Sequence, residues 1–137
     1  MAVYKLLGYD ATNVRSVLPS ASDTAALDTT LDVEGGIRLN SRDISGTYNV
    51  LGSDFLLAVN SSGDEVTINL QSASNNAGRI LIIKDETGQA NVNNITINRN
   101  GSDMIDGQTS FTINTSRTAI ILVSTGSTWL IVSKYTA

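Results

Sequence analysis

The sequence contains no cysteine and no histidine, and these two absences remove several classes of function at once. Without cysteine there is no disulfide framework and no thiolate metal site. Without histidine the chain lacks the residue used most often as a general base, as a zinc ligand and as a switch near neutral pH. Ser–His–Asp and Cys–His arrangements therefore cannot form. We expect a protein that is not an enzyme and that has no cofactor and no metal.

Charge is also scarce, because charged residues make up only 16% of the chain and the formal net charge is −4. Binding to nucleic acid normally needs a basic face that neutralises phosphates, so no nucleic-acid partner is expected. No run approaches the roughly 18 apolar residues of a membrane span. The opening stretch MAVYKLLGYDATNVRS is too weak a pattern for a signal peptide. We therefore expect cytoplasmic synthesis and no membrane partner.

Proline occurs once, at Pro19, within a segment whose apolar residues are scattered, residues 1–46. We predict that this segment is an N-terminal arm with a short helix from Ser20 to about Leu27 and a strand in GIRLNSRDI. An extended arm of about 35 residues reaches on the order of 100 Å, at about 3.3 Å per residue. Such reach is useful to a chain that docks on a neighbour. The candidate partner-docking residues of the arm are Tyr4, Leu6, Leu7, Tyr9, Val17 and Leu18.

Residues 47–137 alternate short runs of apolar and β-branched residues with turn residues. Runs of about four to eight such residues, bounded by Gly, Asn, Asp and Ser, are typical of an all-β sandwich or barrel. We predict one all-β domain over this range, an antiparallel β-sandwich with a jelly-roll-like arrangement. The alternating strands EVTINL and NITIN should each have one buried face. The residues expected to point inward are Val66, Ile68, Leu70, Ile95 and Ile97.

Three other runs are continuously apolar: ILII at 80–83, AIILV at 119–123 and WLIV at 129–132. Strands of this kind are usually covered on both faces. The second cover can be a neighbouring subunit or loops of the same chain, and the runs alone do not separate these alternatives. Trp129 and Ile131 are accordingly candidates for a subunit interface or for the core. A lectin-like role, in which Trp129 stacks on a sugar, is the less favoured interpretation.

Acidic residues beside glycines are the remaining candidates for chemistry. Asp103 and Asp106 could bind calcium or act as acid and base, but turn chemistry is favoured, since Asp side chains bond nearby backbone amides. The adjacent pairs Asp64–Glu65 and Asp85–Glu86 would point to opposite faces of a strand and are predicted to be solvated turn residues. Within this stretch, Asn100–Gly101 and Asp106–Gly107 both indicate tight hairpin turns.

A series of short motifs runs through residues 47–132. Their order is Y-x-V-L-x-x-D, V-T-I-x-L, G-R-x-x-x-I-K-D, N-I-T-I, G-x-D-x-I-D-G and W-x-I, and they begin at Tyr48, Val66, Gly78, Asn94, Gly101 and Trp129. In this order they resemble a module common in virion proteins of tailed bacteriophages, found in tail fibres, baseplates and head decoration. The resemblance implies a β-sandwich-like domain, commonly trimeric, with a structural or adhesive role and no catalysis. It also implies that Lys84 and Asp85 pair or cap a loop.

The chain begins at a methionine and holds one such module and one short arm, which we expect to suit a small protein present in many copies. The function expected is therefore that of a capsid decoration (cement) protein. It would form a homotrimer, bind the major capsid protein and lie on the outer surface of the virion after synthesis in the host cytoplasm. The alternative is a tail-fibre or baseplate component that binds a host receptor, such as a glycan.

Overall fold

The structure is a computed structural model that describes residues 35–137. A compact unit spans Arg38–Ala137 and begins before residue 47, where the sequence had placed the boundary between arm and domain. The helix expected near Ser20 lies outside the described residues. So do the candidate docking residues Tyr4, Leu6, Leu7, Tyr9, Val17 and Leu18.

Nine strands and one 3₁₀ helix make up the secondary structure of residues 35–137. The strands are β1 (Ser41–Ile44), β2 (Thr47–Asn49), β3 (Leu56–Val59), β4 (Val66–Asn69), β5 (Ile80–Asp85), β6 (Ile95–Asn98), β7 (Ser110–Ile113), β8 (Ala119–Ser124) and β9 (Trp129–Tyr135), and the helix is η1 (Ala73–Asn75). The expectation of an all-β domain is confirmed. No helix among these residues is long and apolar enough to cross a membrane.

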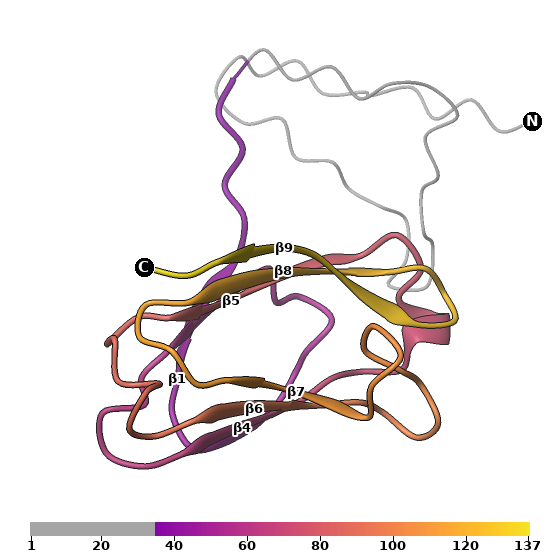
Figure 1. Cartoon of the computed structure of the whole chain (residues 1–137). Coiled ribbons are helices and arrows are strands. Elements are labelled where there is room, and N and C mark those ends of the chain that lie inside the picture. Colours follow the sequence, from indigo (N-terminus) through magenta and orange to yellow (C-terminus); the bar gives the residue numbers. More distant parts are fainter. Residues whose placement is uncertain (1–34) are drawn as a thin grey trace, which may run out of the picture. The chain divides into compact units, whose positions relative to one another are not determined.

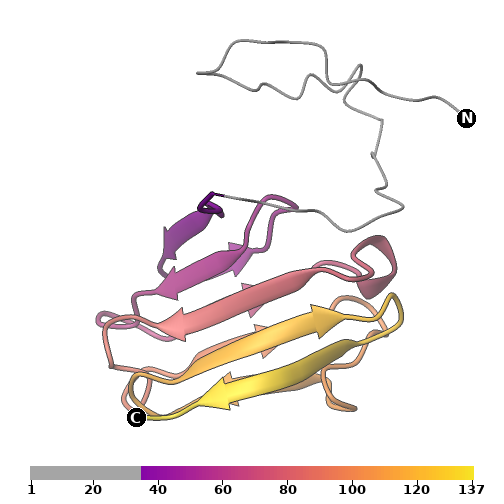
Figure 2. The same cartoon turned by 90° about the horizontal axis from the view of Figure 1, so that it is seen from above.

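The strands form two sheets that face each other as two layers (Figure 1). One sheet has five strands in the order β1-β3-β5-β8-β9, and Figure 2 looks onto its broad face. The other has four strands in the order β2-β4-β6-β7. The arrangement is therefore sandwich-like, with side chains of both sheets meeting between the layers.

The prediction of an antiparallel sandwich is wrong, because both sheets are mixed. From β1 to β6 the chain alternates between the two sheets, so β1, β3 and β5 are neighbours in one sheet and β2, β4 and β6 are neighbours in the other. All four pairs formed by these neighbouring strands are parallel. Only the pairs β5–β8, β6–β7 and β8–β9 are antiparallel. A parallel pair needs a crossover between its strands, and here a strand of the opposite sheet provides it.

The core lies between the sheets, and its position follows from the two-residue period of the strands. The residues that the alternating pattern pointed inward, Val66, Ile68, Leu70, Ile95 and Ile97, are all buried, as predicted. The five-stranded sheet contributes the same alternation within its continuously apolar runs. Its fully buried inward side chains include Leu57, Val59, Leu81, Ile83, Ile120 and Leu122.

The two predicted hairpin turns have different outcomes. Asp106 and Gly107 have positive φ values of 47° and 77°, and the amide of Gln108 donates to the carbonyl of Ile105 at 2.9 Å. This is the predicted tight hairpin turn, since positive φ at both central residues defines its type. Asn100–Gly101 also forms a turn, closed by a 2.9 Å bond from the amide of Asp103 to the carbonyl of Asn100. It does not directly join paired strands.

Candidate functional site

Asp54, the last residue of the first motif, is a buried anchor that joins β1 and β2. Its carboxylate accepts hydrogen bonds from Arg42 Nε at 2.9 Å, Tyr48 Oη at 2.8 Å and the Leu51 amide at 2.8 Å. Burial opposes ionisation, but these donors outweigh it and hold the pKa of Asp54 below its ordinary value of 3.8. All three of these hydrogen-bond donors belong to the protein itself, so the Asp54 carboxylate stabilises the fold.

Asp85 is a second anchor, and the prediction that it is a solvated turn residue is wrong. It is fully buried at the end of β5 and accepts from the amides of Gly88 at 2.9 Å, Ala90 at 3.1 Å and Arg117 at 2.9 Å. Burial alone would raise the pKa of Asp85, and these amide donors lower it below 3.8. Lys84 does not pair with it: its ammonium bonds the carbonyl of Arg117 and lies over the Tyr135 ring. Of the two implied roles, capping a loop is the one that Asp85 performs.

Asp103 also binds backbone, and it does so across a long sequence separation. Its Oδ2 accepts the amide hydrogen of Ala73, the first residue of η1, at 2.7 Å. Asp106 is exposed and occupies the tight turn described above. Among residues 35–137 there is no group of three or more acidic residues placed to hold a metal ion. Asp64 and Glu65 are exposed, as predicted.

Trp129 lies in the core and has no exposed surface. Its indole Nε1 donates to the carbonyl of Gln71 at 3.0 Å, and its backbone amide donates to the carbonyl of Met104 at 2.9 Å. Ile131 is partly buried and packs against the same core. Trp129 therefore belongs to the core, which is one of the two roles that the sequence left open for it. Its ring could stack on a sugar only if the core opened.

Arg79, just before β5, organises the loops at one end of the sandwich. Its Nη1 donates to Gln71 Oε1 at 2.6 Å and to Asn76 Oδ1 at 2.8 Å, and its Nη2 donates to the Asp54 carbonyl at 2.9 Å. Nη2 also reaches the carbonyl of Leu51. In the sequence, Arg79 is recognisable only as a motif position, and its role could not be predicted because its acceptors lie in three separate loops.

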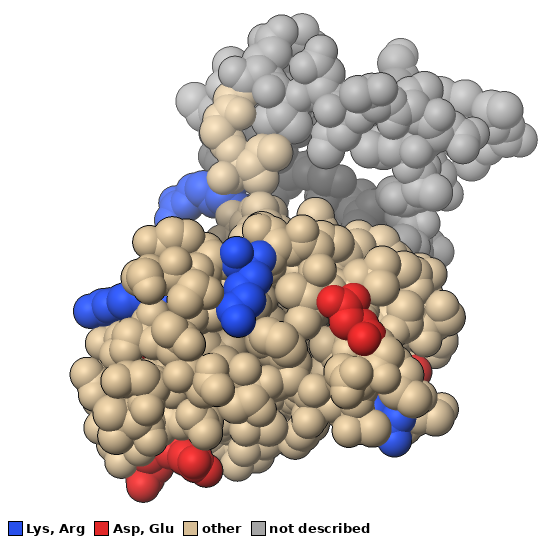
Figure 3. Space-filling view, in the orientation of Figure 1, with Lys and Arg blue, Asp and Glu red and all other residues tan. Residues whose placement is uncertain are grey.

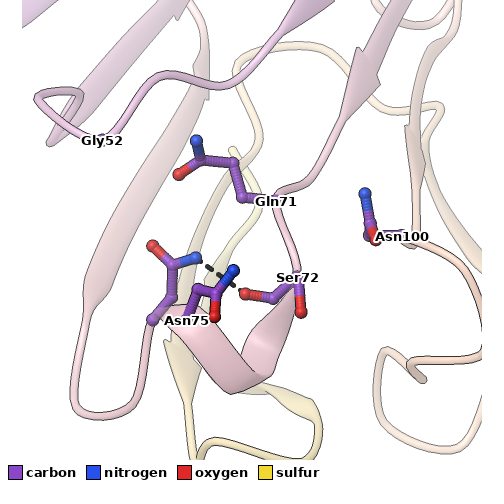
Figure 4. A pocket seen from close by; sticks show the side chains of 6 residues that line it. Gly52, Gln71, Ser72, Asn75 and Asn100 are labelled. Carbon is purple, nitrogen blue, oxygen red and sulfur yellow. Dashed lines mark hydrogen bonds between the residues drawn. The ribbon is translucent and has the colours of Figure 1, made fainter.

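A polar pocket opens beside this arginine, with a volume of about 680 Å³. Figure 4 shows the side chains around it, which come from the β2–β3 loop, the η1 region and the β6–β7 loop. The lining residues are Gly52, Gln71, Ser72, Asn75, Asn76 and Asn100. Each polar lining side chain is an uncharged amide or a hydroxyl. No sequence pattern indicates this site, because its residues are ordinary loop residues far apart along the chain.

The five-stranded sheet also has an apolar surface directed away from the core, here called the outer face. Its residues follow from alternation with the buried ones, and they are Leu56, Ala58, Ile80, Ile82, Ala119, Ile121, Val123 and Leu130. Strand register places Ile80, Val123 and Leu130 in one row across β5, β8 and β9. Ile80 is 44% exposed and Leu130 is 37% exposed. Residues 35–137 form only two layers, so no third layer from this part of the chain covers the outer face.

Charged side chains are sparse and scattered on the side of the molecule seen in Figure 3, where acidic and basic groups do not gather into a patch of one sign. The one ion pair among the described residues joins Arg42 to Asp54. These features leave the outer face and the polar pocket as the two surfaces with a distinctive chemistry. No protein-family model matches the chain, and a search of curated proteins also finds no match.

Proposed function

We propose that this protein is a structural component of a tailed-bacteriophage virion, most specifically a decoration protein on the outer surface of the capsid. In this proposal it assembles as a homotrimer and binds the major capsid protein of the finished shell. The order of motifs from Tyr48 to Ile131 supports the virion assignment. The observation that carries the assembly proposal is the outer face, a sheet surface rich in aliphatic side chains, with Lys84 in the row of Ala58 and Ala119, that has no covering layer within residues 35–137.

The outer face favours protein contacts for a simple energetic reason. Removing apolar surface from water contributes about 25 cal/mol per Å², and contiguous exposed apolar patches on soluble proteins usually mark interaction sites. The row Ile80, Val123 and Leu130 provides such a patch on a rigid sheet. The exposed side chains of Val132 and Tyr135 extend apolar surface along β9. Neighbouring copies of the chain would bury this surface in the proposed trimer.

The motif aspartates support a structural role rather than a catalytic one. Asp54, Asp85 and Asp103 each accept at least one backbone amide hydrogen bond, so their carboxylates hold loop segments in place. A rigid domain is what shell stabilisation requires. A ligand that binds only the assembled shell stabilises it by mass action, and three linked subunits bind more tightly than one through effective concentration.

The assembly step is tested with charge substitutions on the outer face. The double substitution Ile80→Glu with Leu130→Glu alters partly exposed side chains and should leave each subunit folded. Val92→Glu is the matched control, because Val92 is 67% exposed in the loop after β5 and lies outside the outer face. Light scattering at micromolar concentration should give a trimeric mass for the unchanged protein and the control, and a smaller mass for the double variant. A monomeric unchanged protein, or a trimeric double variant, would reject the proposed interface.

The position on the virion is tested by counting copies. Quantitative mass spectrometry of purified particles of the encoding phage should find hundreds of copies per particle, as expected for a decorated shell. Particles without the protein should release their DNA at a lower temperature, and added protein should restore the higher one. A handful of copies, with the protein located on the tail, would instead support the receptor-binding alternative and reject the decoration role.

A further inference from the structure

The polar pocket at the η1 end of the sandwich has features of a ligand site that the assembly proposal does not use. Its lining comes from three separated stretches: Gly52, four residues at positions 71, 72, 75 and 76, and Asn100. Its volume of about 680 Å³ falls within the range of roughly 300–1,000 Å³ that is usual for small-molecule sites. Figure 4 shows the Gln71 and Asn75 side chains on one side and Asn100 across from them.

Two of the side chains that line the pocket, those of Gln71 and Asn76, are held in place by Arg79. Its guanidinium fixes the Gln71 amide through Oε1 at 2.6 Å and the Asn76 amide through Oδ1 at 2.8 Å. Asn76 in turn donates through Nδ2 to the Ser72 carbonyl at 2.7 Å. Since the oxygen of Gln71 faces Arg79, its NH₂ group is the end available to a ligand. Binding groups held in this way lose little freedom when a ligand arrives.

The lining also carries polar groups with no hydrogen-bond partner in the described part of the chain. The side-chain amides of Asn75 and Asn100 make no hydrogen bond there, and the Gln71 NH₂ group makes none either. Each of the two asparagine amides offers two donor hydrogens and one acceptor oxygen. The pocket therefore presents donors and acceptors together around one opening.

This combination selects a ligand class. The lining has no charged side chain, so an anionic ligand would find no lining cation: four of the hydrogen bonds that the Arg79 guanidinium can donate already go to protein oxygens. The lining also has no aliphatic or aromatic side chain to hold an apolar ligand. A neutral molecule with many hydroxyl groups fits best, because each hydroxyl both donates and accepts.

We propose that this pocket binds a neutral saccharide unit through the amides of Gln71, Asn75 and Asn100. Because the lining has no aromatic platform for stacking, each site binds weakly, on the order of millimolar. Several copies on one particle would strengthen attachment to a sugar-coated surface through multivalency. The proposal is independent of where the protein sits on the virion.

The pocket can be altered in two ways without touching the core. Asn75→Ala with Asn100→Ala removes two exposed amides that make no bond to described residues. Gly52→Trp fills the opening, because a Cβ at Gly52 meets no atom within 4 Å and the residue has no positive φ. The matched control is Gln89→Ala. It also removes an exposed side-chain amide, but Gln89 lies in the loop after β5 and is not among the residues that line the pocket.

The test is saturation-transfer NMR on the full chain with glucose, galactose, mannose, N-acetylglucosamine and N-acetylgalactosamine, with glucuronate and glucose 6-phosphate as charged comparators. At least one neutral sugar should give a signal at millimolar concentration, and both pocket variants should lower it fivefold or more while Gln89→Ala leaves it unchanged. Circular dichroism verifies that each variant is folded. No signal from any neutral sugar, an equal signal from a folded pocket variant, or a stronger signal from the charged comparators would overturn the proposal.

Discussion

The Asp85 carboxylate accepts a hydrogen bond from the backbone amide of Arg117 at 2.9 Å, across 32 residues of sequence. Arg117 has a positive φ of 60°, which is uncommon for a residue with a side chain. The same carboxylate bonds the amide of Gly88, whose φ is 75° and where a Cβ would come within 2.6 Å of Arg117 Nε. One buried side chain thus fixes two unusual backbone conformations, and it connects the end of β5 to the β7–β8 loop.

Removing this carboxylate should destabilise the domain strongly. Asp85→Ala leaves three backbone amides without their acceptor, and each buried unsatisfied group costs about 1–3 kcal/mol. We expect a loss of roughly 3 kcal/mol or more in the free energy of unfolding, measured by urea denaturation. Asp64→Ala is the control, because Asp64 is exposed and should change the midpoint little. Equal midpoints for the two variants would contradict the anchoring role of Asp85.

Stability should fall in acid through the same buried carboxylates. The pKa values of Asp54 and Asp85 lie below their ordinary value of 3.8 in the folded state. The stability they contribute is therefore fully present above about pH 4 and is lost as the pH falls from there through the folded-state pKa values. Urea midpoints measured from pH 7 downward should be flat at first and then decline. Asp54→Asn should weaken this decline in the urea midpoint, whereas the control Asp64→Asn should leave it unchanged. If the Asp54→Asn variant declines as the unchanged protein does, Asp54 does not contribute to the loss of stability in acid.

Trp129 offers an optical test of the core. Since it is the only tryptophan and is fully buried, its emission should be blue-shifted and poorly quenched by iodide. Trp129→Phe loses the hydrogen bond to the Gln71 carbonyl and leaves a void, at a cost of about 2–4 kcal/mol. Thermal unfolding followed by circular dichroism measures this loss. Strong iodide quenching of the folded protein would show that the indole is exposed.

A chain shortened to residues 35–137 should fold by itself, because this part of the chain contains a hydrophobic core of its own, built from buried residues between Ile44 and Trp129. Its circular dichroism and tryptophan emission should match those of the full chain. The proposed arm is then tested separately: the shortened protein should no longer stabilise capsids against heat. If it decorates and stabilises heads as well as the full chain does, residues 1–34 are not needed for docking.

The sequence predicted strand identity well and strand neighbours poorly, for a physical reason. Alternation in EVTINL decides which side chains face the core, and Val66 and Ile68 are buried accordingly. Whether β4 pairs with β6 in parallel depends on contacts between distant segments, and no local pattern encodes that choice. The turn at Asp106–Gly107 was predictable, since positive φ at two successive residues has a short-range signature.

The candidate sites were harder to predict, because their residues gain a role only through folding. Asp85 looked like a solvated turn residue, yet it precedes a loop with Gly88 that turns amides back onto it. An aspartate followed three residues later by a glycine, as at Asp85 and Gly88, was the one local pattern that could have indicated this role. Arg79 bonds acceptors in three loops, and the pocket beside it combines Gly52 with Asn100. No local periodicity brings those residues together.

The winding of β1 to β6 between the two sheets makes the parallel strand pairs non-local in the sequence. The two strands of each parallel pair are separated in the sequence by a strand of the opposite sheet. For example, β3 and β5 pair through Leu56 and Ile82, and β4 lies between them in the sequence. Such non-local pairing is slow to form. The β8–β9 hairpin is local, and it brings Trp129 into the core. The interior of the domain is therefore complete only when β9 has joined the five-stranded sheet, because β9 carries Trp129, one of the largest fully buried side chains.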